Sequence, residues 1–79
     1  MNKTKDKLRK ILIKVLELDG DKLPEIINVD NSENWDSLGH IQIIEKLEKE
    51  FNITIKANKV FELLGEIEIL NYLNETLER

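Results

Sequence analysis

A serine and the single histidine of this 79-residue chain, Ser37 and His40, stand three positions apart. Residues at this spacing can face each other on a helix, and a serine beside a histidine suggests nucleophilic catalysis. Such catalysis also needs a third group that orients the histidine and an oxyanion site. The sequence has no nucleophile elbow, and so short a chain leaves little room for a cleft. The pattern therefore disfavours a hydrolase, and we expect His40 to be an exposed polar residue of a helix.

Ser37 also stands directly before a run of apolar residues at helical spacing. A serine in this place can be a helix N-cap, whose side chain accepts hydrogen bonds from free backbone N–H groups. It can equally be a site of covalent attachment, because a phosphodiester at a helix N-terminus meets free N–H groups and the positive end of the helix dipole. Position alone leaves both interpretations open.

Two acidic stretches, residues 19–21 and 30–36, offer oxygen ligands for a cation. Neither has the glycine and the terminal glutamate that a calcium-binding EF-hand loop requires, so we expect turn and cap chemistry there. The absence of cysteine excludes disulfides and thiolate metal sites, and one histidine cannot form a histidine-rich site. No metal site is predicted.

Charge is unevenly spread along the chain. Residues 1–14 hold six basic side chains and one acidic one, a net charge of +5, whereas residues 15–79 hold six basic and fifteen acidic ones, a net charge of −9. An acidic body disfavours nucleic acid and favours partners with basic docking faces. We expect the basic stretch to be the solvated face of a helix. No run is long and apolar enough to span a membrane or to form a signal-peptide core, which predicts a soluble, cytoplasmic protein with no membrane insertion.

Apolar periodicity predicts helices over residues 3–18, 37–51, about 58–64 and 66–77. Gly20 is the expected cap of the first helix, and Asn52 is expected to end the second. Residues 19–36 form a long connection, and residues 53–55 are too few to make a sheet without a second strand. The predicted fold is all-α: a single domain over residues 1–79, a small four-helix bundle with three longer helices, one short one and a long loop between helices one and two.

The apolar residues expected to pack inward fall on one stripe of each helix, and the long loop has apolar anchors of its own. They are Leu8, Ile11, Leu12, Val15 and Leu16 in the first helix; Leu38, Ile41, Ile44, Leu47 and Phe51 in the second; Ile67, Leu70, Leu73 and Leu77 in the fourth, with Ile69 and Tyr72 as further candidates; and Leu23, Ile26, Ile27 and Val29 in the loop. Ile43 lies off the stripe of its helix, which leaves it either a partner contact or an ordinary surface residue.

The stretch Trp35-Asp36-Ser37-Leu38, followed by a helix that closes with Leu47-Glu48-Lys49-Glu50-Phe51, resembles the modification site of acyl carrier proteins. The basic first helix, the long loop, the helix order and the closing Leu70-Asn71-Tyr72-Leu73 extend this resemblance over nearly the whole chain. It implies that Ser37 carries a phosphopantetheine arm, with Asp36 and Leu38 as its motif neighbours.

The resemblance also implies partners and a role. A phosphopantetheinyl transferase, using coenzyme A and magnesium, would load the arm, whose thiol would hold an acyl group as a thioester. Acyl-activating, condensing or acyl-transfer enzymes of fatty-acid, lipid or specialised acyl biosynthesis would then use the cargo. The chain would be a carrier and not an enzyme, and a monomer.

In the family the acyl pocket lies between helices two, three and four, and helix two is the recognition face. The positions that match the pocket are Ile44, Leu47, Ile55, Leu63, Leu64, Ile69 and Tyr72. The candidate partner contacts are His40, Ile43, Glu45 and Glu48.

Some positions depart from the family pattern. Gly39 and Gln42 stand where aspartate and glutamate are common, and Lys46 and Lys49 dilute the acidic face of helix two. Because charge complementarity tunes partner choice, these departures favour a dedicated pathway with its own partners. Two alternatives remain: a carrier of aminoacyl or peptidyl groups, and a helical interaction module without a prosthetic group, in which Ser37 is only a cap.

Overall fold

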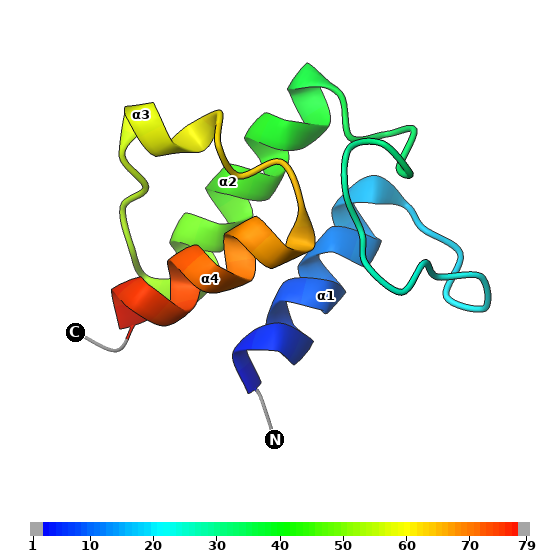
Figure 1. Ribbon diagram of the computed structural model, residues 1–79, viewed down its shortest axis with the longest axis horizontal. Helices are drawn as coiled ribbons and strands as arrows, with labels where there is room; N and C mark the ends of the chain where they lie inside the picture. Colours follow the sequence, from blue (N-terminus) through cyan, green and yellow to red (C-terminus); the bar gives the residue numbers. More distant parts are fainter. Residues whose placement is uncertain (1–2, 78–79) are drawn as a thin grey trace.

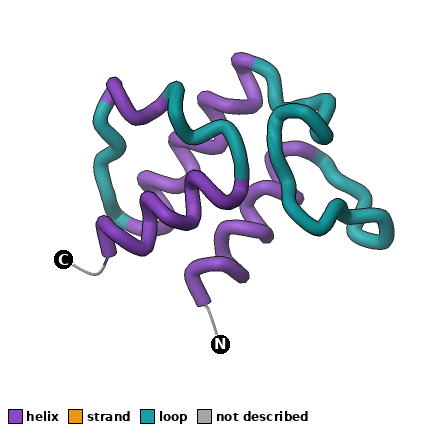
Figure 2. Tube along the Cα trace, in the orientation of Figure 1, coloured by secondary structure: helices purple, strands orange, loops and turns teal. Residues whose placement is uncertain are grey.

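Four helices form an all-α bundle in the computed structural model, which describes residues 3–77 (Figure 1). They are α1 (Lys3–Leu16), α2 (Ser37–Phe51), α3 (Ala57–Val60) and α4 (Glu66–Leu77). Helix α1 packs against both α2 and α4, and the long loop between α1 and α2 winds along one side of the bundle (Figure 2). The predicted fold class is confirmed. Within residues 3–77 no helix is long and apolar enough to cross a membrane.

Helix α1 ends two residues before its predicted end, and Gly20 is not its cap. Glu17 takes the left-handed conformation with φ of 53°, and the N–H of Leu18 donates to the carbonyl of Ile13 across 3.0 Å. This bond closes the last turn in the manner of a Schellman motif. The predicted stripe is confirmed, because Leu8, Leu12 and Leu16 are fully buried and Ile11 and Val15 pack against the core.

Helix α2 has its predicted bounds, and Asn52, with φ of 53°, ends it as expected. Its buried face differs from the prediction. Ile43 is fully buried, so its expected place on the surface is wrong, and Leu38 and Ile41 are 66% and 53% exposed. The helix turns inward the face that carries His40, Ile43, Ile44 and Leu47.

Helix α3 is shorter than predicted. It ends at Val60, and residues 64–66 run antiparallel to residues 27–29 of the long loop. Leu64 accepts a hydrogen bond from the N–H of Val29 at 3.2 Å, and the N–H of Glu66 donates to Ile27 at 2.7 Å. An isolated bridge joins Asn28 to Gly65. This pairing satisfies backbone groups that a longer helix would have satisfied internally.

Helix α4 has its predicted bounds but a different inner face. Leu73 is fully buried as predicted, and so is the further candidate Ile69, whereas the predicted burial of Ile67 and Leu77 is wrong, because both are exposed. The cause is Glu66, which is 3% exposed and forms a salt bridge with Arg9 of α1 at 2.8 Å. This pair turns the start of α4 toward α1, so that the buried stripe begins at Glu66.

The loops complete the core. Trp35 and Ile27 of the long loop and Ile55 of the α2–α3 connection are buried, whereas Ile26 is exposed, contrary to its prediction as an anchor. Residues 53–55 form a connecting segment as expected. The buried apolar residues form one cluster: Leu8, Leu12, Leu16, Ile27, Trp35, Ile43, Ile44, Leu47, Ile55, Leu63, Ile69 and Leu73.

Candidate functional site

Asp36, and not Ser37, caps helix α2. The backbone of Asp36 is extended, and its Oδ1 accepts a hydrogen bond from the N–H of Gly39 at 2.8 Å. Its carbonyl accepts another from the N–H of His40, also at 2.8 Å. Ser37 is therefore the first residue of the helix. Within residues 3–77 the N–H groups of Ser37 and Leu38 have no hydrogen-bond partner, as expected for donors at a helix start that no cap reaches.

The side chain of Ser37 is exposed, and its hydroxyl makes no hydrogen bond with any described residue. Ser32, the other serine of the chain, is buried, and its hydroxyl donates to Asn31 at 3.1 Å. A phosphodiester on Ser37 would meet the free N–H groups of the first turn and the positive end of the helix dipole. The residues present therefore fit a phosphate-linked group at Ser37.

Gly39 allows the loop to cross closely over the first turn of α2. A Cβ atom at this position would overlap the carbonyl oxygen of Asn34. The side-chain amide of Asn34 in turn donates to the carbonyl of Leu16, at the end of α1, across 2.8 Å. The close crossing holds Asp36 at the helix start, which explains a glycine where the family pattern often has aspartate.

His40 is 7% exposed, so the expectation of an exposed polar residue is wrong. Its Nδ1 accepts a hydrogen bond from the indole N–H of Trp35 at 3.0 Å. Its Nε2 lies 2.6 Å from the carbonyl of Val60 and donates to it in the tautomer that the indole bond requires. With both ring nitrogens engaged, His40 cannot act as a base for Ser37, which removes the hydrolase arrangement.

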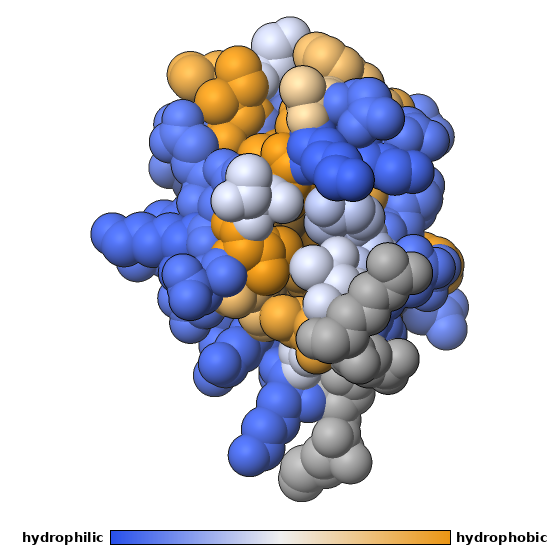
Figure 3. All heavy atoms as spheres, turned by 90° about the vertical axis from the view of Figure 1, so that its left-hand side faces the viewer, coloured by the Kyte–Doolittle hydropathy of each residue, from blue (hydrophilic) through white to orange (hydrophobic). Residues whose placement is uncertain are grey.

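A hollow of about 310 Å³ opens beside Ser37. Its wall combines the start of α2, the end of the long loop and the segment after α3: Val29, Trp35, Asp36, Ser37, His40, Ile41, Val60, Phe61 and Leu64. Phe61 is 77% exposed at its edge. Figure 3 shows hydrophobic side chains gathered at the upper end of the molecule, where Figure 1 places α3 and the start of α2. The attachment candidate thus borders an apolar surface.

The residues matched to the family's acyl pocket are distributed differently. Ile44, Leu47, Ile55, Leu63 and Ile69 belong to the packed core, whereas Leu64 lines the hollow beside Ser37. Tyr72 borders a separate hollow with Thr54, Lys56, Lys59, Glu75 and Thr76. The sequence pattern did not indicate Ile41, Val60 or Phe61 as lining residues. The available signal was Phe61, an aromatic residue close to Gly65 that no predicted core stripe included.

Of the candidate partner contacts on α2, Glu45 is exposed. Ile43 is fully buried and cannot meet a partner. Glu48 is half-buried, and its carboxylate accepts the N–H of Ile55 at 2.8 Å, which gives it a structural role. The acidic stretches of the loop serve turns, as predicted: Asp19 Oδ1, for example, accepts the N–H of Asp21 at 2.9 Å.

An all-α bundle with a free serine hydroxyl at the first residue of a helix has the fold and the exposed group of a covalent carrier. The family model described as the phosphopantetheine attachment site matches residues 6–73, and the chain belongs to this family. It is therefore a carrier protein with covalently attached 4′-phosphopantetheine. Domains of this family are non-catalytic carriers that interact with phosphopantetheinyl transferases and acyl-processing enzymes. Comparisons with curated proteins and with solved structures gave no match.

Proposed function

We propose that Ser37 bears the 4′-phosphopantetheine arm, and that the protein carries acyl groups between enzymes of fatty-acid, lipid or specialised acyl biosynthesis. One observation carries the assignment of the serine. Asp36 supplies the cap of α2, so the hydroxyl of Ser37 is exposed and unbonded among the described residues. A serine that only capped the helix would direct its oxygen to the backbone.

The arm supplies a terminal thiol that holds cargo as a thioester. The chain's own part is to present the hydroxyl and to stabilise the phosphate. The N–H groups of Ser37 and Leu38, which have no partner within residues 3–77, lie at the same helix start as the attachment point, and the helix dipole favours the negative charge of the phosphate. His40 is occupied by Trp35 and Val60, so the base that takes the proton of Ser37 belongs to the transferase.

The apolar wall beside Ser37 supports an acyl cargo over an aminoacyl or peptidyl one. Ile41, Val60, Phe61 and Leu64 lie within reach of a group tethered at Ser37, in one continuous hollow. Burying hydrocarbon there stabilises the loaded protein by about 0.8 kcal/mol for each methylene removed from water. A polar aminoacyl group gains much less, because its ammonium and amide groups lose hydration.

The cargo is tested by loading the protein with arms that already bear acetyl, butyryl, octanoyl or glycyl groups, and measuring thermal unfolding. We expect the melting temperature to rise with the length of the acyl chain and to change little with glycyl. Phe61→Ser should reduce the rise, and Ile67→Ser on the exposed side of α4 serves as the matched control. An equal effect of octanoyl and glycyl groups would contradict an acyl carrier.

Attachment itself is tested by incubating the protein with coenzyme A, magnesium and a broad-specificity phosphopantetheinyl transferase. One phosphopantetheine group for each chain is expected by intact mass, and none on Ser37→Ala. A folded wild-type protein that takes up no group from two different transferases would support the interaction module without a prosthetic group.

We propose that partner enzymes meet the surface around Ser37, where Leu38, Ile41 and Glu45 are exposed on α2. The departures from the family's acidic helix-two pattern support a dedicated set of partners. The remaining proposals are that residues 1–79 act as one domain, as a monomer, in the cytoplasm. The single core cluster supports one domain, and coenzyme A as donor of the arm supports the cytoplasm.

A further inference from the structure

A groove runs between α1 and α2, away from the hollow at Ser37. It consists of two hollows of about 350 and about 450 Å³ that share Lys14, Val15 and Lys46. The full lining is Lys7, Lys10, Ile11, Lys14, Val15, Gln42, Glu45, Lys46, Lys49 and Glu50. Its length along two helices suits an elongated ligand more than a compact one.

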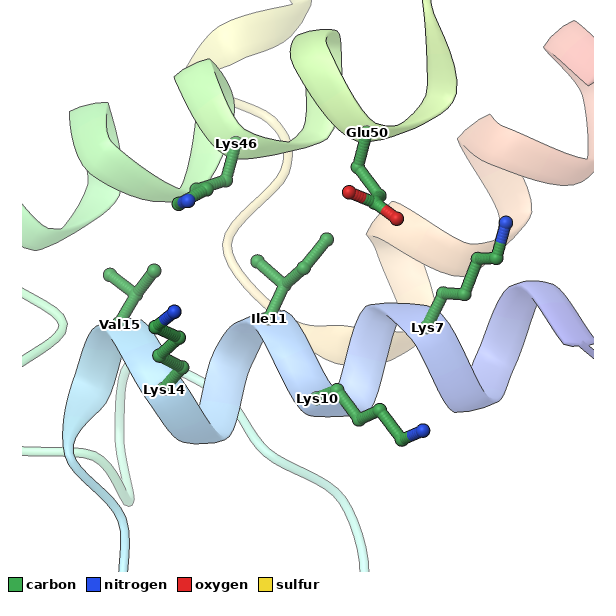
Figure 4. A pocket seen from close by; sticks show the side chains of 7 residues that line it. All are labelled: Lys7, Lys10, Ile11, Lys14, Val15, Lys46 and Glu50. Atoms are coloured by element: carbon green, nitrogen blue, oxygen red, sulfur yellow. The ribbon is translucent and has the colours of Figure 1, made fainter.

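The groove has an apolar floor and charged rims. Figure 4 shows Ile11 and Val15 pointing from α1 toward α2, and Lys46 and Glu50 pointing from α2 toward α1. Ile11 and Val15 are half-buried and rest on the core cluster. The lysines and glutamates around them are exposed. This cross-section matches a ligand with one apolar face and charged flanks.

The rims are basic in a protein whose net charge is −4. Five lysines and two glutamates line the groove, a net charge of +3. None of the five lysines forms a salt bridge within residues 3–77, where the salt bridges are Arg9–Glu66 and Lys59–Glu62. Lys7, Lys10 and Lys14 follow one another at i+3 and i+4 spacing on α1, where like charges repel one another and destabilise the helix. They do attract and orient an acidic partner.

Helix geometry separates the groove from the modification site. Lys46 follows Ser37 by nine positions, and at about 100° for each residue it projects from the opposite side of α2. The hollow beside Ser37 is accordingly lined from α3 and the long loop, and the groove is lined from α1. A ligand in the groove leaves Ser37 accessible, and Glu45 lies where the groove borders the surface proposed for partner enzymes.

We propose that the groove between α1 and α2 docks an acidic amphipathic helix of a partner protein. The helix would place apolar residues at i, i+3 or i+4, and i+7 on Ile11 and Val15, with glutamates or aspartates against the lysines, in the helix-in-groove mode. Such docking holds the carrier on one protein while Ser37 faces another, and so raises the effective concentration of cargo at that enzyme.

Other acidic ligands fit the groove less well. The apolar residues are recessed between two helices, whereas membrane association requires apolar side chains that reach the acyl region. None of the described residues that line the groove is aromatic, so bases of a single-stranded nucleic acid have no ring to stack on. The net negative charge of the chain also repels phosphates.

The test is a titration of the ¹⁵N-labelled protein with a capped synthetic helix that bears leucines on one face and glutamates on the flanks. A peptide of the same composition, scrambled to spread the leucines around the helix, is the control. We expect saturable amide shift changes at Ile11, Val15 and Lys46, but not at Ser37 or Phe61. The scrambled peptide should bind at least about tenfold more weakly, because it loses the apolar contact.

Charge reversal supplies the second arm. Lys14→Glu/Lys46→Glu should weaken binding by about tenfold or more, whereas Lys22→Glu/Lys56→Glu, with the same change in net charge outside the groove, should have an effect several times smaller. Circular dichroism verifies that each variant is folded. If Lys14→Glu/Lys46→Glu does not fold, Lys14→Gln/Lys46→Gln takes its place. Equal binding of both peptides, equal effects of the two variants, or shift changes centred on Ser37 would overturn the proposal. So would binding to phosphatidylglycerol vesicles through Lys14 and Lys46 without binding to the peptide.

Discussion

The indole N–H of Trp35 donates a hydrogen bond to Nδ1 of His40 across 3.0 Å, and the planes of the two rings are inclined by 24° with their centroids 6.3 Å apart. Because Nδ1 accepts, the proton of the neutral ring lies on Nε2, which donates to the carbonyl of Val60. One imidazole thus joins the end of the long loop, helix α2 and the end of α3. These are the three segments that surround the hollow beside Ser37.

His40→Ala should destabilise the protein by about 1–3 kcal/mol, since it leaves the buried indole N–H and the Val60 carbonyl without partners. Trp35→Phe removes the donor together with part of the buried ring, so its own cost includes lost packing. Urea unfolding of the two single variants and of the double variant gives the coupling free energy between Trp35 and His40, which we expect to be about 1 kcal/mol. Gln42→Ala, an exposed change on the same helix, is the control. Additive effects of the two substitutions would contradict the bond.

Gly39→Ala should destabilise the protein by about 1–3 kcal/mol, because the added methyl group meets the carbonyl of Asn34. The sign of the change in the free energy of unfolding is informative, because alanine in place of glycine inside a helix otherwise stabilises a protein by about 1 kcal/mol. Gly20→Ala, where nothing lies within 4 Å, should be neutral or slightly stabilising. Urea midpoints compare the two, and a stabilising Gly39→Ala would contradict the close crossing of the loop.

Arg9→Met should destabilise the protein by about 3–5 kcal/mol, because it leaves the carboxylate of Glu66 buried without its counter-charge. Arg9 also donates to the carbonyls of Pro24 and Glu25. In the wild-type protein Oε1 of Glu66 accepts the N–H of Ile27 at 3.1 Å. Glu66→Gln should destabilise the protein less than Arg9→Met, because the amide oxygen of glutamine can still accept this bond. Lys10→Met on the exposed side of α1 is the control for chemical denaturation. A cost for Arg9→Met no larger than that of Lys10→Met would exclude the ion pair as a stabilising contact.

Asp36→Ala and Ser37→Ala should differ in their effect on stability. Loss of the cap at Asp36 costs about 1 kcal/mol, whereas Ser37 makes no hydrogen bond among the described residues that its replacement could break. Thermal unfolding of the unmodified variants measures this difference. If Ser37→Ala proves the more destabilising, Ser37 acts as the cap and the structural basis for its free hydroxyl is lost.

Features of the fold that depend on residues close together in the sequence were predicted correctly, and features that depend on contacts between distant segments were not. The bounds of α2 were correct because its caps, Asp36 and Asn52, and its apolar repeat are local, and those of α4 because its apolar repeat is local. The inner face of α2 was wrong because two sets of positions both satisfy helical spacing. The set that is actually buried includes His40, which counts as polar until its bonds to Trp35 and Val60 are known.

The other differences have the same origin. The end of α3 and the face of α4 depend on pairing between residues 27–29 and 64–66 and on the Arg9–Glu66 ion pair, and both join segments far apart in the sequence. Ser37 was recognised as a candidate because its motif is contiguous. The hollow beside it was not, because Ile41, Val60 and Phe61 meet only in the folded chain.

The most direct test of the central claim is to locate the phosphopantetheine group by tandem mass spectrometry after enzymatic loading. Wild type and Ser32→Ala, which removes the other serine of the chain, should carry it on Ser37, and Ser37→Ala should carry none. A group found on any other residue, or uptake by Ser37→Ala equal to wild type, would contradict the account.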